Sequence, residues 1–494
     1  MDINQKQFQH CVQFFVSIAA CALLSSCSMF EKLNKNYVPK QTISVTKIAP
    51  GWQGTLPHDG QIANLQQFWE QLHDPLLVEM ISAAQEVAPS IASAKARIFE
   101  AKVNTVRANA ARLPNITGGM TWSRTLQKSG TGGGSFSGGA FSTTRVGFDA
   151  SWEPDIFGTD TILFDAAKVQ EKASKANWHE ARVSVAAEVA NAYFNQRFCQ
   201  LQANVQQADV NSRAETARLT KISSDAGFSS AYSSNLADAG LADAQQQLTG
   251  RQAECDLDVK ALVAITQMDE PSLRQKLASN AFTLEQDQAD NVFSIEEIPA
   301  KVIAQRPDIY NAEAALIDAA ANIRDKQTAL LPKVVIDGSL GYTHISGSRA
   351  FNNSGTAFPI GPISISLPIF DGGVNRANIK SAKVHYEEEA ANYRSKVQYA
   401  VKEVEDSLIN LHSTASRRKD LINAIAGYKA ALTATEAKVK AGFANLIELE
   451  EIRRTTLLAE TTHLDVSKER LLAWVALYRA AGGGWTQAQT EQEF

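Results

Sequence analysis

The chain contains one stretch of sequence twice, and this duplication constrains its fold more than any other feature. Residues 89–116, PSIASAKARIFEAKVNTVRANAARLPNI, align without a gap with residues 307–334, PDIYNAEAALIDAAANIRDKQTALLPKV. Both copies begin with a proline and carry a Leu-Pro pair near their end. Proline suits the first turn of a helix, where its missing N–H is not needed, whereas a later proline ends the helix. Each copy therefore predicts a helix between its two prolines.

Further landmarks repeat in the same order along the chain. The tripeptide AGF occurs at Ala226–Phe228 and again at Ala441–Phe443, and EPDIFG at 153–158 corresponds to LPIFDGG at 367–373. The sequence therefore predicts a tandem duplication of one structural unit. We place the first repeat at 71–290 and the second at 291–494.

After each Leu-Pro pair the hydrophobic period changes from that of a helix to that of a strand. In RVGFDASWE, for example, Val146, Phe148 and Trp152 alternate with polar residues. Runs of about ten such residues suit a tilted membrane strand, although a soluble hairpin with one wet face gives the same pattern. We expect strands at about 114–127, 141–155, 332–345 and 360–370. Glycine- and serine-rich loops at 128–140 and 346–358 are expected to join them in pairs.

Prolines and long helical tracts flank these strands. Pro114, Pro154, Pro332 and Pro368 are expected at the junctions between helices and strands. Proline-free tracts follow at about 160–225, 229–268, 374–440 and 444–480, and in the third the residues Val397, Val401, Val404, Leu408 and Leu411 have coiled-coil spacing. A helix of about 65 residues is about 100 Å long, which suits a strut or the wall of a tube better than a compact domain.

The AGF tripeptides are predicted to be the tips of two helical hairpins, because glycine readily takes the left-handed conformation that ends a helix. Phe228 and Phe443 either pack back onto their own hairpins or form a docking surface for another protein. Cys199 and Cys255 are each 28 residues from Gly227, so they lie at the same height on neighbouring helices. A disulfide between them requires Cα atoms within about 7 Å.

Composition and motifs argue against nucleic-acid binding, metal binding and catalysis. The net charge is −5 with a pI near 6.0, which does not favour a nucleic-acid partner. The histidines are scattered and no CxxC pair occurs, so no metal site is predicted. No HExxH, no nucleophile triad and no phosphate-binding loop is present, and TGGGS lies between strands rather than before a helix, so we expect neither catalysis nor a cofactor.

The first 26 residues have the pattern of a lipoprotein signal peptide. Lys6 precedes the apolar run CVQFFVSIAACALL, and LSSC at Leu24–Cys27 resembles a bacterial lipobox. This predicts a diacylglycerol on Cys27 and a lipid-anchored segment at 27–70; the alternative is the end of a buried helix. Beyond residue 27 no apolar stretch reaches the roughly 20 residues of a membrane-spanning helix.

Two copies of helix, strand, loop, strand and long helical hairpin behind a lipobox resemble the TolC-type outer-membrane efflux family. Within it, IAQRPDIYNAEAALIDAAANI at 303–323 is similar to the lipid-anchored branch that serves resistance-nodulation-division (RND) pumps, and the resemblance covers about 62–485. It implies a mixed fold of long α-helical hairpins and four β-strands per chain. It further implies a homotrimer that forms a 12-stranded outer-membrane β-barrel continued by a periplasmic α-helical barrel. Residues 269–300 and 481–494 would form a belt around this tunnel.

The resemblance also implies a function and partners. The protein would be a passive exit duct for drugs or other small toxic compounds, working with a periplasmic adaptor and an inner-membrane RND pump, and held in outer-membrane lipid by acylated Cys27. The hairpin tips Ala226, Gly227, Phe228, Ala441, Gly442 and Phe443 would contact the adaptor, and Glu436 would lie at the periplasmic gate unless it is an ordinary solvated glutamate. A conduit for type I protein secretion and a periplasmic coiled-coil scaffold without a pore are the alternatives.

Overall fold

The computed structural model describes residues 68–126, 140–280, 282, 306–347, 353–357 and 359–484. The predicted signal peptide, Cys27, nearly all of the 27–70 segment, and much of the predicted loops and belt lie outside these residues. The described chain forms two units. The first contains the described parts of Lys102–Gln170 and Glu313–Asn392, and the second contains those of Ile48–Ala101, Glu171–Ala312 and Tyr393–Phe494.

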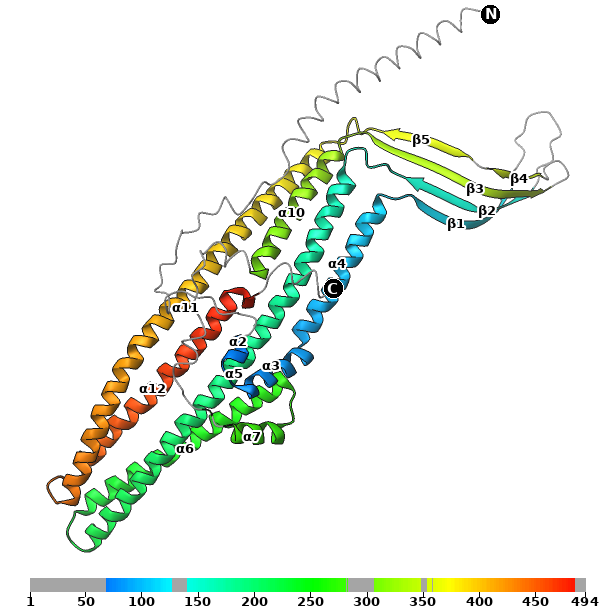
Figure 1. Cartoon of the computed structure of the whole chain (residues 1–494). Coiled ribbons are helices and arrows are strands. Elements are labelled where there is room, and N and C mark those ends of the chain that lie inside the picture. Colours follow the sequence, from blue (N-terminus) through cyan, green and yellow to red (C-terminus); the bar gives the residue numbers. More distant parts are fainter. Residues whose placement is uncertain are drawn as a thin grey trace, which may run out of the picture. The chain divides into compact units, whose positions relative to one another are not determined.

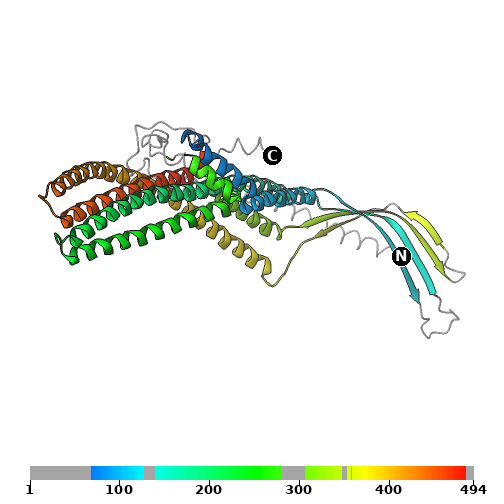
Figure 2. The same ribbon diagram turned by 90° about the horizontal axis from the view of Figure 1, so that it is seen from below.

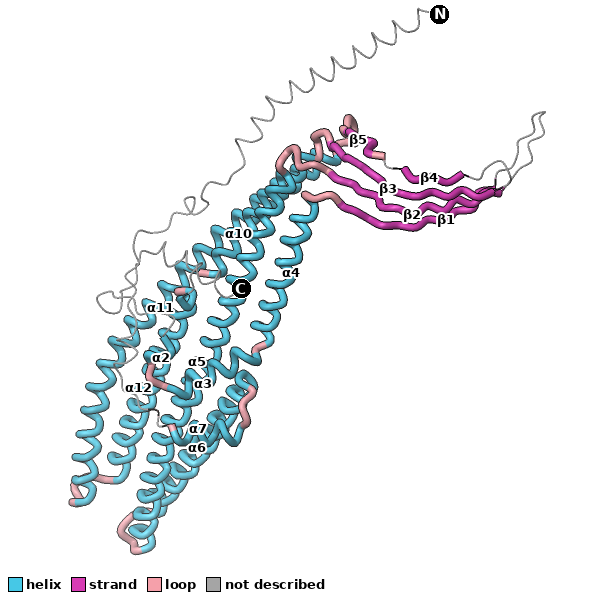
Figure 3. Tube along the Cα trace, turned by 45° about the vertical axis from the view of Figure 1, so that its right-hand side comes forward, coloured by secondary structure: helices cyan, strands magenta, loops and turns pink. Residues whose placement is uncertain are grey.

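The first unit contains an antiparallel sheet (Figure 1; magenta in Figure 3). Its strands are β1 Asn115–Leu126, β2 Ala140–Trp152, β3 Lys333–Gly347, β4 Asn353–Ala357 and β5 Ile360–Ser366. The order across the sheet is β1-β2-β3-β4, and β5 also pairs with β3. Strands from both repeats therefore belong to one sheet, joined where β2 meets β3.

The four predicted strands are present, but several boundaries differ. β2 ends at Trp152 rather than near 155, and β5 ends at Ser366 rather than near 370; prolines follow at Pro154 and Pro368, and proline cannot donate to a strand ladder. β3 continues to Gly347, and β4 lies within 346–358, which the sequence predicted as a loop. The composition of β4, NSGTA, is typical of a loop, and its strand conformation comes from pairing with Gly341–Ile345 of β3.

The register gives the sheet two unlike faces. Paired positions Met120, Val146 and Tyr342 carry apolar side chains across three strands, and the neighbouring Phe148 is paired with Leu340. The alternate positions are mostly threonine, serine, glycine and charged residues. The apolar side chains are largely exposed in the single chain. This face therefore needs an apolar surrounding other than the chain itself.

The helices repeat in order and in length. α4 Pro89–Ala111 and α10 Pro307–Thr328 precede the strand pairs, and both start at the predicted proline. Two 67-residue helices follow the strands, α5 Thr159–Asp225 and α11 Val374–Lys440. Each turns back into a shorter partner, α6 Ala231–Thr266 and α12 Leu446–Ala480 (Figure 2). The tandem repeat predicted from the sequence is confirmed.

Three short helices, α2 Phe68–Gln71, α3 Pro75–Val87 and α7 Glu270–Ser279, pack on the long ones in the second unit. Asp74 caps α3 by accepting hydrogen bonds from the amides of Leu76 and Leu77. The Asp74 carboxylate also accepts from the Tyr193 hydroxyl of α5 and from the Asn280 amide. Burial, together with the bond to Asp74, raises the pKa of Tyr193 above its ordinary value. One carboxylate thus joins α3, α5 and the end of α7.

Arg306, in the RPD triplet that precedes α10, is a second buried junction. Its guanidinium donates to the carbonyl of Ala480 at 2.9 Å and forms ion pairs with Asp308 at 2.8 Å and Glu403 at 2.7 Å. It therefore ties the start of α10 to α11 and to the end of α12. Nearby, four of the five predicted seam residues of α11 are buried: Val397, Val404, Leu408 and Leu411.

Two glycines paired across β1 and β2 provide a matched stability test. A methyl group on Gly147 would lie 2.5 Å from the Leu340 carbonyl oxygen, whereas one on its partner Gly119 would meet nothing within 4 Å. We expect Gly147→Ala to destabilise the protein by about 1–3 kcal/mol, because the strands must move apart. Gly119→Ala should leave the melting temperature, followed by circular dichroism, unchanged. Equal melting temperatures of the two variants would contradict this close approach.

Candidate functional site

The candidate site comprises the two hairpin tips and the cleft between them, all in the second unit. At the first tip the Phe228 amide donates to the Ser223 carbonyl at 2.8 Å and the Gly227 amide to the Ser224 carbonyl at 3.0 Å. One of these bonds is nested inside the other, and Gly227 has φ +77°. This is the Schellman motif, in which a glycine ends a helix.

The second tip has the same construction. Phe443 donates to the Lys438 carbonyl at 2.8 Å and Gly442 to the Val439 carbonyl at 3.0 Å, and Gly442 has φ +78°. Ser230 and Asn445 then cap α6 and α12 through their side chains. The structure thus places a tight turn at each predicted tip.

The two tip phenylalanines are exposed. Phe228 is 87% and Phe443 84% accessible, so the alternative in which they pack back onto their own hairpins is wrong for the single chain. Exposing an aromatic ring to water gains nothing for the fold. These rings are therefore available to a partner.

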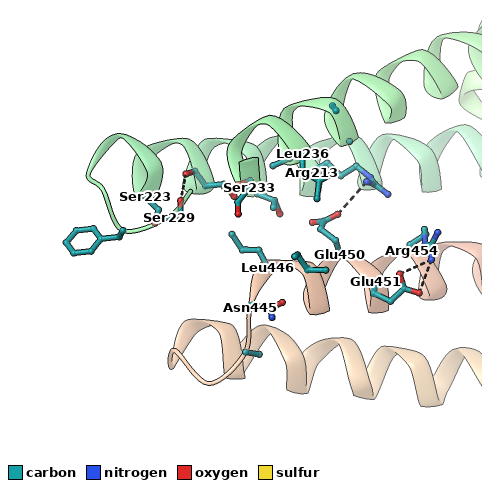
Figure 4. Close-up of a pocket in the computed structure, with 18 of the residues that line it drawn as sticks. Arg213, Ser223, Ser229, Ser233, Leu236, Asn445, Leu446, Glu450, Glu451 and Arg454 are labelled. Carbon is teal, nitrogen blue, oxygen red and sulfur yellow. Dashed lines mark hydrogen bonds and ion pairs between the residues drawn. The ribbon is translucent and has the colours of Figure 1, made fainter. Parts of the chain in front are cut away.

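A cleft of about 780 Å³ lies between the first hairpin and the beginning of α12 in the second hairpin (Figure 4). The α5 and α6 side contributes hydroxyl groups, including those of Thr216, Ser223 and Ser233, together with Leu236. The α12 side contributes the apolar Leu446 and Ile447 and the charged Glu450, Glu451 and Arg454. Both walls of the cleft therefore combine polar and apolar side chains.

Charged side chains bridge the hairpins near this cleft. Arg213 of α5 contacts Asp209 on its own helix at 2.9 Å and Glu450 of α12 at 3.5 Å. Arg453 of α12 donates to the Thr216 hydroxyl of α5 at 2.9 Å and pairs with Glu450 at 2.5 Å. The Arg453 side chain is only 11% exposed, so this bridge is shielded more than an ordinary surface pair.

Glu436 belongs to the same network. Its carboxylate on α11 lies 3.9 Å from the Arg453 guanidinium and its side chain is 42% exposed. Sequence reasoning selected Glu436 but missed Arg213, Glu450 and Arg453. The i, i+3 pair of Glu450 and Arg453 was visible in the sequence, but its contact with α5 depends on how the two hairpins pack.

The cysteine pair marks another level of the hairpins. Cys199 of α5 and Cys255 of α6 form a disulfide with their Cα atoms 5.4 Å apart. At the same separation of 28 residues from Gly442, the second hairpin has Thr414 and Arg470. Arg470 is buried and donates to the Leu411 carbonyl at 2.6 Å. At this level, therefore, a covalent bond joins the two helices of the first hairpin, and a buried cation joins those of the second.

The remaining predicted residues lie outside this site. Pro114 and Pro332 immediately precede β1 and β3, while Pro154 and Pro368 lie between a strand and the next long helix. Among the described residues, no three His, Cys, Asp or Glu side chains are grouped to hold a metal ion. Within the same ranges, no helix has both the length and the apolar character needed to cross a membrane.

Comparison with solved structures identifies the fold. The structure of the outer-membrane channel OprN matches with a TM-score of 0.78 at 24% sequence identity, over 89% of this chain and 98% of OprN. The two chains therefore share one fold over nearly their whole described length.

Sequence comparison gives the family. The model described as outer membrane efflux protein matches residues 80–266 and 298–483, one stretch in each repeat. The chain belongs to the outer membrane efflux protein family, and it is an efflux protein of the outer membrane. It is 28% identical over 491 residues to the outer membrane protein OprJ of Pseudomonas aeruginosa, with 97% of each chain covered. It is also 28% identical over 377 residues to the cation efflux system protein CusC of Escherichia coli O6:H1, over 73% of this chain and 78% of CusC.

The bridge between the hairpins can be tested with two adjacent arginines. Arg453→Gln removes the contacts to α5 and α11, so amide hydrogen exchange at the start of α12 should rise by roughly a factor of five, as expected for about 1 kcal/mol of lost coupling. Arg454→Gln is the control, because Arg454 pairs with Glu451 of its own helix and is well exposed. Equal exchange in both variants would show that Arg453 does not hold the hairpins together.

Proposed function

We propose that three copies of this chain form the passive exit duct of a tripartite efflux pump. The observation that carries the proposal is the sheet with one apolar face, one polar face and open edges. Among the described strands β1 pairs only with β2, and β4 and β5 pair only with β3. Unpaired backbone groups are not tolerated in lipid, where they cost several kcal/mol each. A closed ring of copies, with the apolar face toward lipid and the polar face toward water, satisfies both requirements.

The ring follows from pairing β1 of one copy with the free edge of the next. The short strands β4 and β5 both pair with the edge of β3 opposite β2 and count together as a fourth strand, so three copies give the twelve-stranded barrel that the family resemblance implies. The polar face then lines a water-filled duct, and the long hairpins form its periplasmic wall. Transport through this duct needs no chemistry in the chain itself. The energy would come from an inner-membrane pump, to which a periplasmic adaptor connects the duct.

The proposal is tested with the purified full-length protein. Native mass spectrometry should give three times the mass of the mature chain, and the protein should form conducting pores in planar bilayers. The mass of the N-terminal peptide tests the lipid on Cys27. A monomer that remains soluble without detergent and forms no pore would contradict the duct.

The bridge of Arg213, Glu450, Arg453 and Glu436 is proposed as the gate that closes the periplasmic end. It connects the two hairpins close to their tips, so breaking it allows them to separate without unfolding either one. The Glu436 side chain is 42% exposed and lies 3.9 Å from Arg453, so this contact is weak enough to be broken by a docking partner. Glu436 is proposed to act in two ways, by holding Arg453 and by placing a carboxylate near the pore.

Single-channel recording tests the gate. Arg453→Gln should raise the open probability about five-fold, because about 1 kcal/mol of closed-state stabilisation is lost. Glu436→Ala should act in the same direction and also change cation selectivity, whereas Arg454→Gln should behave as wild type. A wild-type recording from both Arg453→Gln and Glu436→Ala would remove this network from the gate.

The hairpin tips are proposed as the contact with the adaptor. Ala226–Phe228 and Ala441–Phe443 project an exposed ring from a short, well-capped turn, and such aromatic anchors are typical of protein interfaces. The equal geometry of the two tips presents two similar docking elements per chain.

Substitutions at the second tip separate docking from folding. Phe443→Asp should weaken binding to the purified adaptor at least about ten-fold, while Phe443→Leu should retain most of it. Gly442→Arg places a bulky charge at a left-handed position and should abolish drug efflux without lowering the yield of trimer. Normal drug resistance in cells that carry Gly442→Arg would refute the docking role.

A conduit for type I protein secretion is the second candidate, because the same exit duct would serve it. Relatives are named for efflux of cations, export of pyoverdine and efflux of solvents or toluene. These names favour small compounds over proteins as the cargo. Restored resistance to such compounds in a deletion strain, without restored protein secretion, would separate the two candidates.

A further inference from the structure

The polar face of the sheet carries a row of glycines between two charged residues. Gly147 of β2 is paired with Gly119 of β1 and Gly341 of β3, and Gly341 is paired with Ala357 of β4. Four adjacent strands thus have no side chain larger than a methyl group at one level. A single glycine in a strand is common, but a row across a sheet creates a shallow trough on one face.

The neighbouring rows contain one charge each. Arg145 lies between Thr121 and Thr343, and Asp149 lies between Thr117 and Ser339. These two rows border the glycine row on either side. All three rows share one face of the sheet, because their positions on each strand differ by two residues.

The Arg145 side chain lies along the trough. Its Nη2 atom is 2.5 Å from the Asp149 carboxylate, four residues further along the same strand. Its Nε atom lies 3.6 Å from the position that a Cβ on Gly341 would occupy. The ion pair therefore spans the level of the glycine row and passes close to Gly341.

Stability does not explain the ion pair. The Arg145 and Asp149 side chains are 43% and 54% exposed, and an exposed pair of this kind contributes little to folding. Glycine weakens a strand, because it has no side chain to pack and loses more conformational freedom than other residues. Gly147 is nevertheless required by the close approach of β2 to β3, so what needs explaining is the ion pair that holds one long cationic side chain along these glycines.

We propose that Asp149 holds Arg145 flat against the glycine row, so that this level of the duct stays wide and carries no unbalanced charge. The inference rests on the proposed function, in which the polar face lines the duct. With three copies, three arginines would otherwise project into the water at one level. Folded onto the wall and neutralised, the three arginines add no net charge at this level of the duct.

Conductance and reversal potential in planar bilayers test the proposal. Asp149→Asn releases Arg145, so the conductance should fall and the ratio of chloride to potassium permeability should rise about two- to five-fold, as expected for unbalanced charges near the ion path. Arg145→Gln leaves Asp149 unbalanced and should shift selectivity toward potassium. The double variant Arg145→Gln/Asp149→Asn should return both quantities to wild-type values.

Asp337→Asn is the matched control. Asp337 lies on the same face of β3, paired with Ser151, two residues beyond the level of Asp149. Its loss removes a carboxylate without releasing Arg145, so the conductance should not fall as it does in Asp149→Asn. If Asp149→Asn behaves like Asp337→Asn, or leaves conductance and selectivity unchanged, the proposal is overturned.

The heat resistance of each trimer on gels distinguishes an effect on the stability of the sheet from an effect on ion passage. Lower heat resistance with unchanged selectivity would mean that the pair only stabilises the sheet, which also overturns the proposal. If one single variant fails to assemble, the other still gives a decisive shift. Wild-type protein that forms no pore would overturn the duct itself, whereas conducting wild type with unaffected variants would overturn only the role of Asp149.

Discussion

The antiparallel pairing of β2 with β3 is the interaction on which the rest of the structure depends. It joins the strands of the two repeats into one sheet, and its register places apolar residues on one face and polar residues on the other. Both edges of this sheet are unpaired among the described strands, so neither water nor lipid satisfies all of its surfaces. Its apolar face avoids water and its edges avoid lipid. The proposed ring of three copies follows from this constraint.

Much of the fold could be predicted from the sequence, because local signals agreed with one another. Proline positions gave the starts of α4 and α10, and glycine with its neighbours gave both tips. Alternation gave the strands. The β4 strand was missed because its composition favours a loop, and only the edge of β3 orders it. Where pairing with a distant strand overrides local preference, a single sequence does not predict the local structure.

The candidate site was less predictable, because it depends on contacts between segments far apart in the chain. Glu436 was chosen by its distance from a glycine, but its meaning changes once Arg453 is seen beside it. Arg453, in turn, donates a hydrogen bond to Thr216, which is more than two hundred residues away in the chain. The glycine row has the same character. Gly119, Gly147 and Gly341 are unremarkable one by one, and only the register brings them together.

The equal length of α5 and α11 has a consequence for how such a chain can change. Because the two 67-residue helices rise together by about 1.5 Å per residue, removing one heptad from either would offset its tip by about 10 Å from the other. Arg213 and Arg453 would then face empty space or the wrong turn. Insertions and deletions in one half are therefore tolerated only when the other half acquires them too. The two halves of the chain are therefore constrained to keep long helices of equal length.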